Sequence, residues 1–106
     1  MEIGDNMEKV LLIIPAYNEA ENIKWVVEEL RRTDASLDYI IINDGSKDDT
    51  SSICRENGYH FIDIPINVGL SEVFRTGIKY AVRNGYVMAM QYDGDGQHDP
   101  HYVNAW

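Results

Sequence analysis

The sequence predicts an α/β fold in which helices cover both faces of a parallel sheet. Short apolar runs rich in β-branched residues alternate with longer segments whose apolar residues recur at helical spacing. Strand and helix alternate along the chain from a first strand to a fourth, and parallel strands require such helical crossovers. A chain of 106 residues can bury one core but not two, so residues 1–106 are expected to form a single domain.

The first strand and the first helix are indicated by an apolar run followed by a capping signal. Residues 10–14 are apolar and end at Pro15, which is typical of a strand buried on both faces. Asn18 and Glu21 form a variant capping box, so a helix is expected to begin at Asn18. Residues 39–42 are the second buried strand.

The remaining elements follow the same alternation. Ser46 together with Asp49 predicts the start of a second helix. Strands are expected over residues 59–64 and 86–92, and a helix is expected over residues 71–84 between them.

The chain is expected to end in a helix, and the ligand site is expected at one edge of the sheet. Asp99 followed by Pro100 resembles an N-cap and a first helical residue. A Rossmann-like sheet of this kind binds ligands outside the carboxyl ends of its strands. The informative segments are therefore those that follow the strands, namely residues 15–19, 43–46, 65–70 and 93–99.

Charge and composition restrict the class of ligand. Nine basic and 18 acidic residues give a net charge of −9, which disfavours nucleic acid as a partner. Binding of phosphate would need a local feature such as a metal ion or a helix N-terminus.

A lone cysteine, Cys54, fits a reducing compartment. Residues 1–9 lack the apolar core of a signal peptide and are expected to be flexible, so the expected location is the cytoplasm.

Asp93 and Asp95 are the strongest candidates for a metal site. Residues i and i+2 leave an extended chain on the same side, so the two carboxylates can meet at one point. At a distance of about 5 Å they would repel by roughly 3 kcal/mol in a cleft unless a cation lay between them. Hard oxygen ligands suit Mg²⁺ or Mn²⁺. A solvated glycine-rich turn is the alternative, and the position after a strand favours the metal.

Other polar residues after the strands admit two interpretations each. Asp44 could accept a hydrogen bond from a nucleobase, or it could bond the backbone of its own turn. Tyr17 could stack on a base or cover the sheet edge, and Glu19 could serve only the helix dipole. Asn67 and Gly69 precede a helix N-terminus that could hold an anion, although turn chemistry explains both residues.

Four motifs in order, each after a predicted strand, resemble those of the family 2 glycosyltransferases. They are Ile14-Pro15-Ala16-Tyr17-Asn18-Glu19, Asn43-Asp44-Gly45-Ser46 with Asp48 and Thr50, Asn67-Val68-Gly69-Leu70 with Thr76-Gly77, and Asp93-Gly94-Asp95-Gly96-Gln97-His98. The third motif also resembles the polyprenyl-phosphate mannosyl- and glucosyltransferase branch. The resemblance implies the nucleotide-sugar-binding, N-terminal half of a GT-A fold.

The resemblance also implies roles for individual residues. Residues that would line the pocket for a UDP- or GDP-sugar are Pro15, Ala16, Tyr17 and Glu19. Asp44 would contact the base. Asp93 and Asp95 would form the DXD motif, with Asp95 the direct ligand of Mn²⁺ or Mg²⁺, and Gly94 and Gln97 would lie near the donor.

The chain stops soon after the fourth motif, whereas complete members of that family continue. The missing part normally holds the acceptor site, the catalytic base and any membrane-associated helices, so no general base is assigned and this chain alone is expected to be inactive. The acceptor would be a hydroxyl or a polyprenyl phosphate. A longer form could lie at the cytoplasmic face of a membrane, and an exposed sheet edge could lead this chain to self-associate.

Two other classes of protein share this size and alternation. A receiver-like regulatory module would have an acidic pair directly after the first strand, where this chain has Pro15, Ala16 and Tyr17. A dinucleotide-binding oxidoreductase would have a G-x-G-x-x-G loop, and none follows any predicted strand.

Overall fold

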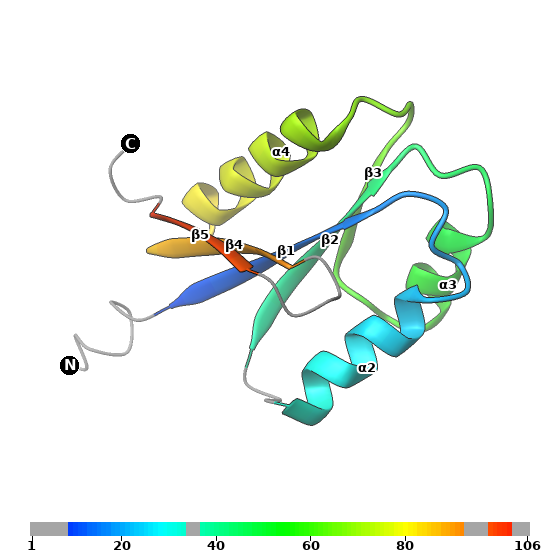
Figure 1. The fold of residues 1–106 in the computed structure, drawn as a ribbon, viewed down its shortest axis with the longest axis horizontal. Helices are drawn as coiled ribbons and strands as arrows, with labels where there is room; N and C mark the ends of the chain where they lie inside the picture. The colour runs from blue at the N-terminus through cyan, green and yellow to red at the C-terminus, as the bar shows by residue number, and fades with distance from the viewer. Residues whose placement is uncertain (1–8, 34–36, 93–97, 103–106) are drawn as a thin grey trace.

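The computed structural model describes residues 9–33, 37–92 and 98–102. The described elements form one twisted sheet with helices on both sides (Figure 1). In chain order they are β1 (Val10–Ala16), α2 (Ile23–Thr33), β2 (Asp38–Asp44), α3 (Thr50–Glu56), β3 (Phe61–Ile64), α4 (Leu70–Arg83), β4 (Met88–Tyr92) and β5 (His98–Tyr102). The predicted α/β class is confirmed.

The sheet has the strand order β3-β2-β1-β4-β5. β1 pairs in parallel with β2 and with β4, and β2 pairs in parallel with β3. The chain therefore moves outward from β1 to β3 and then returns through α4 to the other side of β1. Ligands of such open sheets bind where the strand order reverses, which here lies at the carboxyl ends of β1 and its neighbours.

The last element differs from the prediction. Asp99 and Pro100 belong to β5, which pairs antiparallel with β4 and places Met90 opposite Pro100. The expected helix is therefore wrong. β5 lies at an edge of the sheet, where a proline is tolerated because one side of the strand needs no ladder hydrogen bonds.

Successive residues of the central strands enter two apolar clusters, one on each face of the single sheet. Leu12 and Ile14 pack under α2 and α3 with Ile23, Val27 and other apolar residues. Leu11 and Ile13 pack on the opposite face, together with residues of α4. The continuous apolar run at residues 11–14 is thus explained, because both faces of β1 are covered (Figure 1).

Cys54 is fully buried in the core under α2 and α3, and burial raises the pKa of its thiol to about 11. The thiol therefore stays protonated at neutral pH and is unreactive.

Among the described helices, none combines the length and the apolar character that crossing a bilayer requires.

α4 approaches β1 so closely that one helix position has no room for a side chain. A methyl group at Gly77 would lie 2.6–2.8 Å from three side-chain carbons of Ile13. Because Ile13 is completely buried, it has little freedom to move away.

We expect Gly77→Ala to lower the free energy of unfolding by about 1–2 kcal/mol, because the cost of overpacking exceeds the gain in helix propensity. Urea denaturation would measure the difference. Lys79→Ala, at an exposed position of the same helix, serves as the control and should change stability by less than about 0.5 kcal/mol. A Gly77→Ala variant as stable as the parent would show that α4 does not lie this close to β1.

Candidate functional site

A pocket of ≈ 250 Å³ opens at the carboxyl edge of the sheet, where β1 and β2 end and α4 begins. Its lining residues are Pro15, Ala16, Tyr17, Glu19, Asp44, Asn67, Gly69, Leu70 and Val73. Five of them are residues that the sequence singled out after the first two strands. They come from segments up to 58 residues apart (73 − 15), and only the sheet brings them together.

Asp44 is the polar centre of this pocket. Its carboxylate accepts hydrogen bonds from the backbone N–H of Val68 at 2.8 Å and of Gly69 at 3.0 Å. The side-chain amide of Asn67 adds a third hydrogen bond at 3.1 Å. The side chain is almost completely buried, and these donors replace the water that its charge has lost.

This arrangement decides between the two interpretations of the segment before α4. The amides of Val68 and Gly69, which could have held a ligand anion, instead bind the carboxylate of Asp44. Asp44 itself bonds a loop 23 or more residues away and not its own turn. A carboxylate offers about four acceptor positions, so one remains for a ligand.

Gly45 allows the same loop to lie directly against the end of β2. Its φ of +69° is in the left-handed region, which favours glycine. A methyl group at this position would lie 2.4 Å from the backbone nitrogen of Asn67 and 2.5 Å from the carbonyl carbon of Ile66. A side chain here would therefore push the loop away from the pocket.

The loop after β1 is held by polar side chains of the loop after β2. Asn18 donates its N–H to Ser46 Oγ and accepts from the N–H of Lys47, each at 2.8 Å. The N–H of Glu19 donates to Thr50 Oγ1 at 3.0 Å, and that of Ala20 donates to Asp48 Oδ2 at 3.1 Å. These bonds fix the backbone that carries Tyr17 and Glu19.

Both helices that follow these loops begin later than the sequence indicated. Asn18 bonds the neighbouring loop, and α2 begins at Ile23, whose N–H donates to the carbonyl oxygen of Glu19. α3 begins at Thr50, and Asp49, its N-cap residue, makes no side-chain capping bond. Asn18 and Ser46, which the sequence indicated as capping residues, thus make contacts between the two loops.

Tyr17 and Glu19 lie at the rim of the pocket. Tyr17 is 44% exposed, so a ligand at the rim can reach its side chain. Glu19 accepts a hydrogen bond from the Asn22 side chain at 3.3 Å and is half-buried. Pro15 and Ala16 complete this wall, with Ala16 buried at the end of β1.

The candidate metal residues lie outside the described residues. These are Asp93 and Asp95, together with the donor-site candidates Gly94 and Gln97. The residues that flank them, Tyr92 and His98, are paired with each other at the end of β4. Within the described part of the chain, no group of three His, Cys, Asp or Glu side chains could hold a metal ion.

Sequence reasoning missed part of the lining. Asn67 was considered for turn chemistry, but its side-chain bond to Asp44 was not foreseen. Leu70 and Val73 also line the pocket, and Leu70 is the first residue of α4. Leu70 ends the segment 65–70 that the sequence marked as informative, but it was given no role, and Val73 lies beyond that segment.

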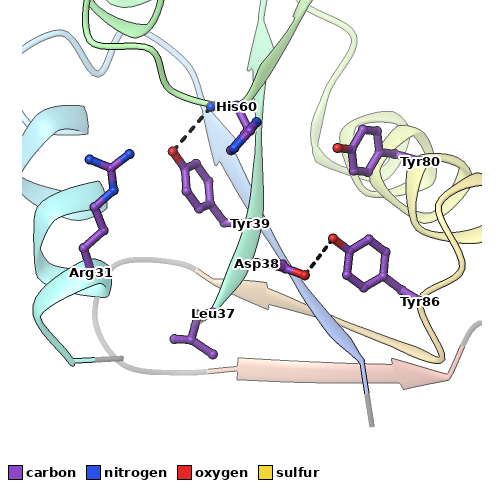
Figure 2. Close-up of a pocket in the computed structure, with 7 residues that line it drawn as sticks. All are labelled: Arg31, Leu37, Asp38, Tyr39, His60, Tyr80 and Tyr86. Carbon is purple, nitrogen blue, oxygen red and sulfur yellow. Dashed lines mark hydrogen bonds between the residues drawn. The ribbon is translucent and has the colours of Figure 1, made fainter. Parts of the chain in front are cut away.

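A second hollow of ≈ 410 Å³ lies at the opposite edge, where β2 begins. Figure 2 shows Tyr39 and His60 on one side of β2 and Asp38 and Tyr86 on the other. The hydroxyl of Tyr86 donates a hydrogen bond to Asp38 at 2.9 Å. Burial is the larger cause, and this bond the second, of a raised pKa of Tyr86. This hollow contains none of the residues predicted for ligand binding, and it lies away from the strand ends where such sheets bind ligands.

We expect Asp44→Asn to lower the free energy of unfolding by about 1–3 kcal/mol. The amide nitrogen of asparagine cannot accept a hydrogen bond, so N–H donors of the loop would lose their acceptor. Urea denaturation would measure the loss. Asp49→Asn is the matched control, because Asp49 is exposed and makes no capping bond. Equal stability of the two variants would contradict the role assigned to the Asp44 carboxylate.

The pH dependence of stability should include a contribution from Asp48. The Thr50 hydroxyl, 2.5 Å from Oδ1, is the largest cause that holds the pKa of Asp48 below its ordinary value of 3.8. A carboxylate with a lowered pKa stabilises the fold above its unfolded pKa, and the contribution disappears as the pH falls through the folded pKa. Asp48→Asn should therefore flatten the dependence of the urea midpoint on pH between about pH 5 and pH 2. A curve as steep as that of the parent would contradict this role.

The sequence is similar to proteins whose names describe sugar transferases and a polysaccharide synthase. It is 28% identical over 99 residues to a polyprenol monophosphomannose synthase of Mycolicibacterium smegmatis, covering 88% of this chain and 37% of that protein. It is 36% identical over 108 residues to a UDP-N-acetylglucosamine–dolichyl-phosphate N-acetylglucosaminyltransferase of Methanococcus voltae, covering 86% and 43%. A poly-β-1,6-N-acetyl-D-glucosamine synthase of Staphylococcus aureus is 31% identical over 105 residues, covering 93% and 25%. The chain spans less than half the length of each relative.

The fold is similar to that of solved glycosyltransferases. The mannosyltransferase PcManGT from Pyrobaculum calidifontis, solved in complex with GDP-Man and Mn²⁺, superimposes with a TM-score of 0.71. The match covers 82% of this chain and 27% of that chain at 21% sequence identity. This likeness confirms the GT-A-like arrangement of the parallel sheet and its helices.

The family model for Glycosyl transferase family 2 matches residues 11–105. That range contains every residue that lines the pocket and all four of the motifs that follow the strands. The chain belongs to glycosyl transferase family 2.

Proposed function

We propose that this chain is the donor-binding part of a glycosyltransferase that uses a nucleoside diphosphate sugar and a divalent metal ion. The observation that supports this most directly is the pocket formed by Pro15, Ala16, Tyr17, Glu19 and Asp44 at the carboxyl edge of the sheet. Open α/β sheets bind nucleotides at this place. The names of the relatives, which refer to sugar transferases and a UDP-sugar, support the same class of donor.

The base of the nucleotide is proposed to lie between Tyr17 and Asp44. The exposed ring of Tyr17 offers a stacking surface at the rim. The one acceptor position of Asp44 that the loop does not use would receive an N–H of uracil or guanine. Because three hydrogen bonds hold the carboxylate, this acceptor is oriented before the ligand arrives.

Asp93 and Asp95 are proposed as ligands of Mn²⁺ or Mg²⁺, with Gly94 and Gln97 close to the donor. Their carboxylate oxygens are the ligand type that these ions prefer. β4, which directly precedes them, is paired in parallel with β1, so its carboxyl end faces the same way as the end that forms the pocket. When bound, the ion would stabilise the charge that develops on the departing diphosphate. The Mn²⁺ in the PcManGT complex is consistent with this proposal.

The reaction proposed for the longer enzyme is a displacement at the anomeric carbon. An acceptor oxygen forms a bond to that carbon while the bond from the carbon to the diphosphate breaks, and the electron pair leaves with the nucleoside diphosphate. The acceptor is a hydroxyl, which must lose a proton, or a polyprenyl phosphate, which is already ionised. The relatives' names include both lipid and polysaccharide products, and no residue of this chain is assigned as general base.

Thermal unfolding with UDP or GDP, in the presence of Mn²⁺ or of a chelator, tests donor binding. A nucleotide at 100 times its Kd should stabilise the protein by about 2.7 kcal/mol. For a domain of this size the Tm should rise by roughly 10 °C or more.

Asp95→Ala should remove the part of this shift that depends on Mn²⁺, whereas the exposed Asp49→Ala should retain it. The proposal that this chain binds the donor would be wrong if neither UDP nor GDP raised the Tm of the parent in the presence of Mn²⁺.

A further inference from the structure

Side-chain hydrogen bonds lead from the edge strand β3 to the loop after β1. Asp63 Oδ1 accepts a hydrogen bond from the side-chain amide of Asn43 at 2.9 Å. The side-chain oxygen of Asn43 accepts from the hydroxyl of Ser46, and Ser46 Oγ accepts from the backbone N–H of Asn18 at 2.8 Å. We call Asp63, Asn43 and Ser46 the polar relay. It connects Asp63, which is not among the described residues that line the pocket, with the residue that follows Tyr17.

The sheet places the first two members of the polar relay side by side. Asn43 is paired in parallel with Asp63 on one neighbouring strand and with Ala16 on the other. Residues that are paired in this way direct their side chains to the same face of the sheet. Asn43 is only 3% exposed, so both ends of its amide need partners within the protein. The relay supplies one partner for each end.

The carboxylate of Asp63 sets the direction of the hydrogen bonds in the relay. An ionised carboxylate can only accept, so it binds the nitrogen end of the Asn43 amide and leaves the oxygen end for Ser46. The hydroxyl of Ser46 donates its one proton to that oxygen, and its lone pairs are then available for the N–H of Asn18. Without Asp63 the amide could turn round, and its nitrogen would compete with Asn18 for the Ser46 oxygen.

The last hydrogen bond holds the peptide group between Tyr17 and Asn18. Asn18 has a φ of +54°, and among the described residues other than glycine it alone lies in the left-handed region. This conformation is costly for a residue with a side chain and persists only where other contacts hold it. The N–H of Asn18 on Ser46 Oγ is one such contact, and the N–H of Lys47 on Asn18 Oδ1, at 2.8 Å, is a second. The held peptide group includes the carbonyl of Tyr17, so it limits the positions that the Tyr17 side chain can take.

We propose that Asp63 is a positioning residue of the donor site, which holds Tyr17 against the nucleobase without touching the ligand. This inference rests on the proposed function, because it takes Tyr17 as the surface on which the base stacks. Asp63 acts through Asn43 and Ser46, and each step of this path is a hydrogen bond. The edge strand β3 thereby contributes to a pocket that lies at the ends of β1 and β2.

Asp63→Ala and Ser51→Ala form a matched pair of variants. Asp63 Oδ1 binds Asn43, whereas Oδ2 accepts the hydroxyl of Ser51 in α3 at 2.8 Å. Asp63→Ala removes both bonds, and Ser51→Ala removes only the bond to α3. The ion pair of Asp63 with Arg55, at 3.7 Å between two exposed side chains, contributes little. A difference between the two variants therefore reports the bond from Asp63 to Asn43.

Hydrogen exchange of the Asn18 amide, followed by NMR without any ligand, tests the polar relay itself. Asp63→Ala should speed the exchange of this amide roughly threefold to tenfold, because its hydrogen bond to Ser46 Oγ becomes weaker. Ser51→Ala should exchange at the rate of the parent. Equal exchange rates in the two variants would overturn the proposal.

Calorimetric titration with UDP and with GDP, in the presence of Mn²⁺, tests the effect on the donor site. Asp63→Ala should weaken binding of the preferred nucleotide about threefold to fivefold, whereas Ser51→Ala should bind it as the parent does. In a chain that already carries Tyr17→Ala, adding Asp63→Ala should have almost no further effect, because a positioning residue acts only through the side chain that it positions. A general loss of structure would weaken binding by the same factor with and without Tyr17, and that result would overturn the proposal.

Failure of the positioning role and failure of the donor site give different results. If Asp63→Ala bound the nucleotide as tightly as the parent, the donor site would stand and the role of Asp63 would be overturned. If the parent bound neither UDP nor GDP, the proposed function would be wrong and the positioning role would fall with it. In that case faster exchange of the Asn18 amide in Asp63→Ala would still show that Asp63 holds this loop.

Discussion

The candidate site depends on the hydrogen bonds that the carboxylate of Asp44 accepts from the loop before α4. Three donors, two of them backbone N–H groups, surround a charge that is almost completely removed from water. A buried carboxylate without such partners would cost several kcal/mol, so the loop can leave this position only at a high energetic cost. These hydrogen bonds therefore shape the pocket and fix the loop that leads into α4.

The loop after β1 is positioned by the same principle. Asn18, Ser46, Asp48 and Thr50 connect two loops that are about 30 residues apart, and none of these bonds depends on apolar packing. The apolar residues of β1 and β2 fix the layers of the fold, and the polar residues that follow them fix the loops. This division of roles between apolar and polar residues explains why the motifs after the strands are polar although the strands are apolar.

The polar contacts also bear on how an acidic protein could bind an anionic ligand. Two of the carboxylates at this edge, those of Asp44 and Asp48, are already paired with N–H or O–H donors of the chain. Their charge is partly compensated before any ligand binds. In the proposed function, Asp93 and Asp95 are left for a divalent ion, and the ion in turn faces the diphosphate.

The sequence by itself determined the class of the fold, the approximate place of each strand and helix up to β4, and the pocket residues at or just after the carboxyl ends of β1 and β2. These follow from the apolar periodicity of the sequence and from the general rule that parallel strands end at a common edge of their sheet. Only the tertiary structure decided where α2 and α3 begin, that Asp99 and Pro100 lie in a strand, and that the amides before α4 bind Asp44. The physical reason is that Asn, Asp and Ser side chains can bond either their own helix or a distant loop, and packing of the sheet determines which partner is within reach.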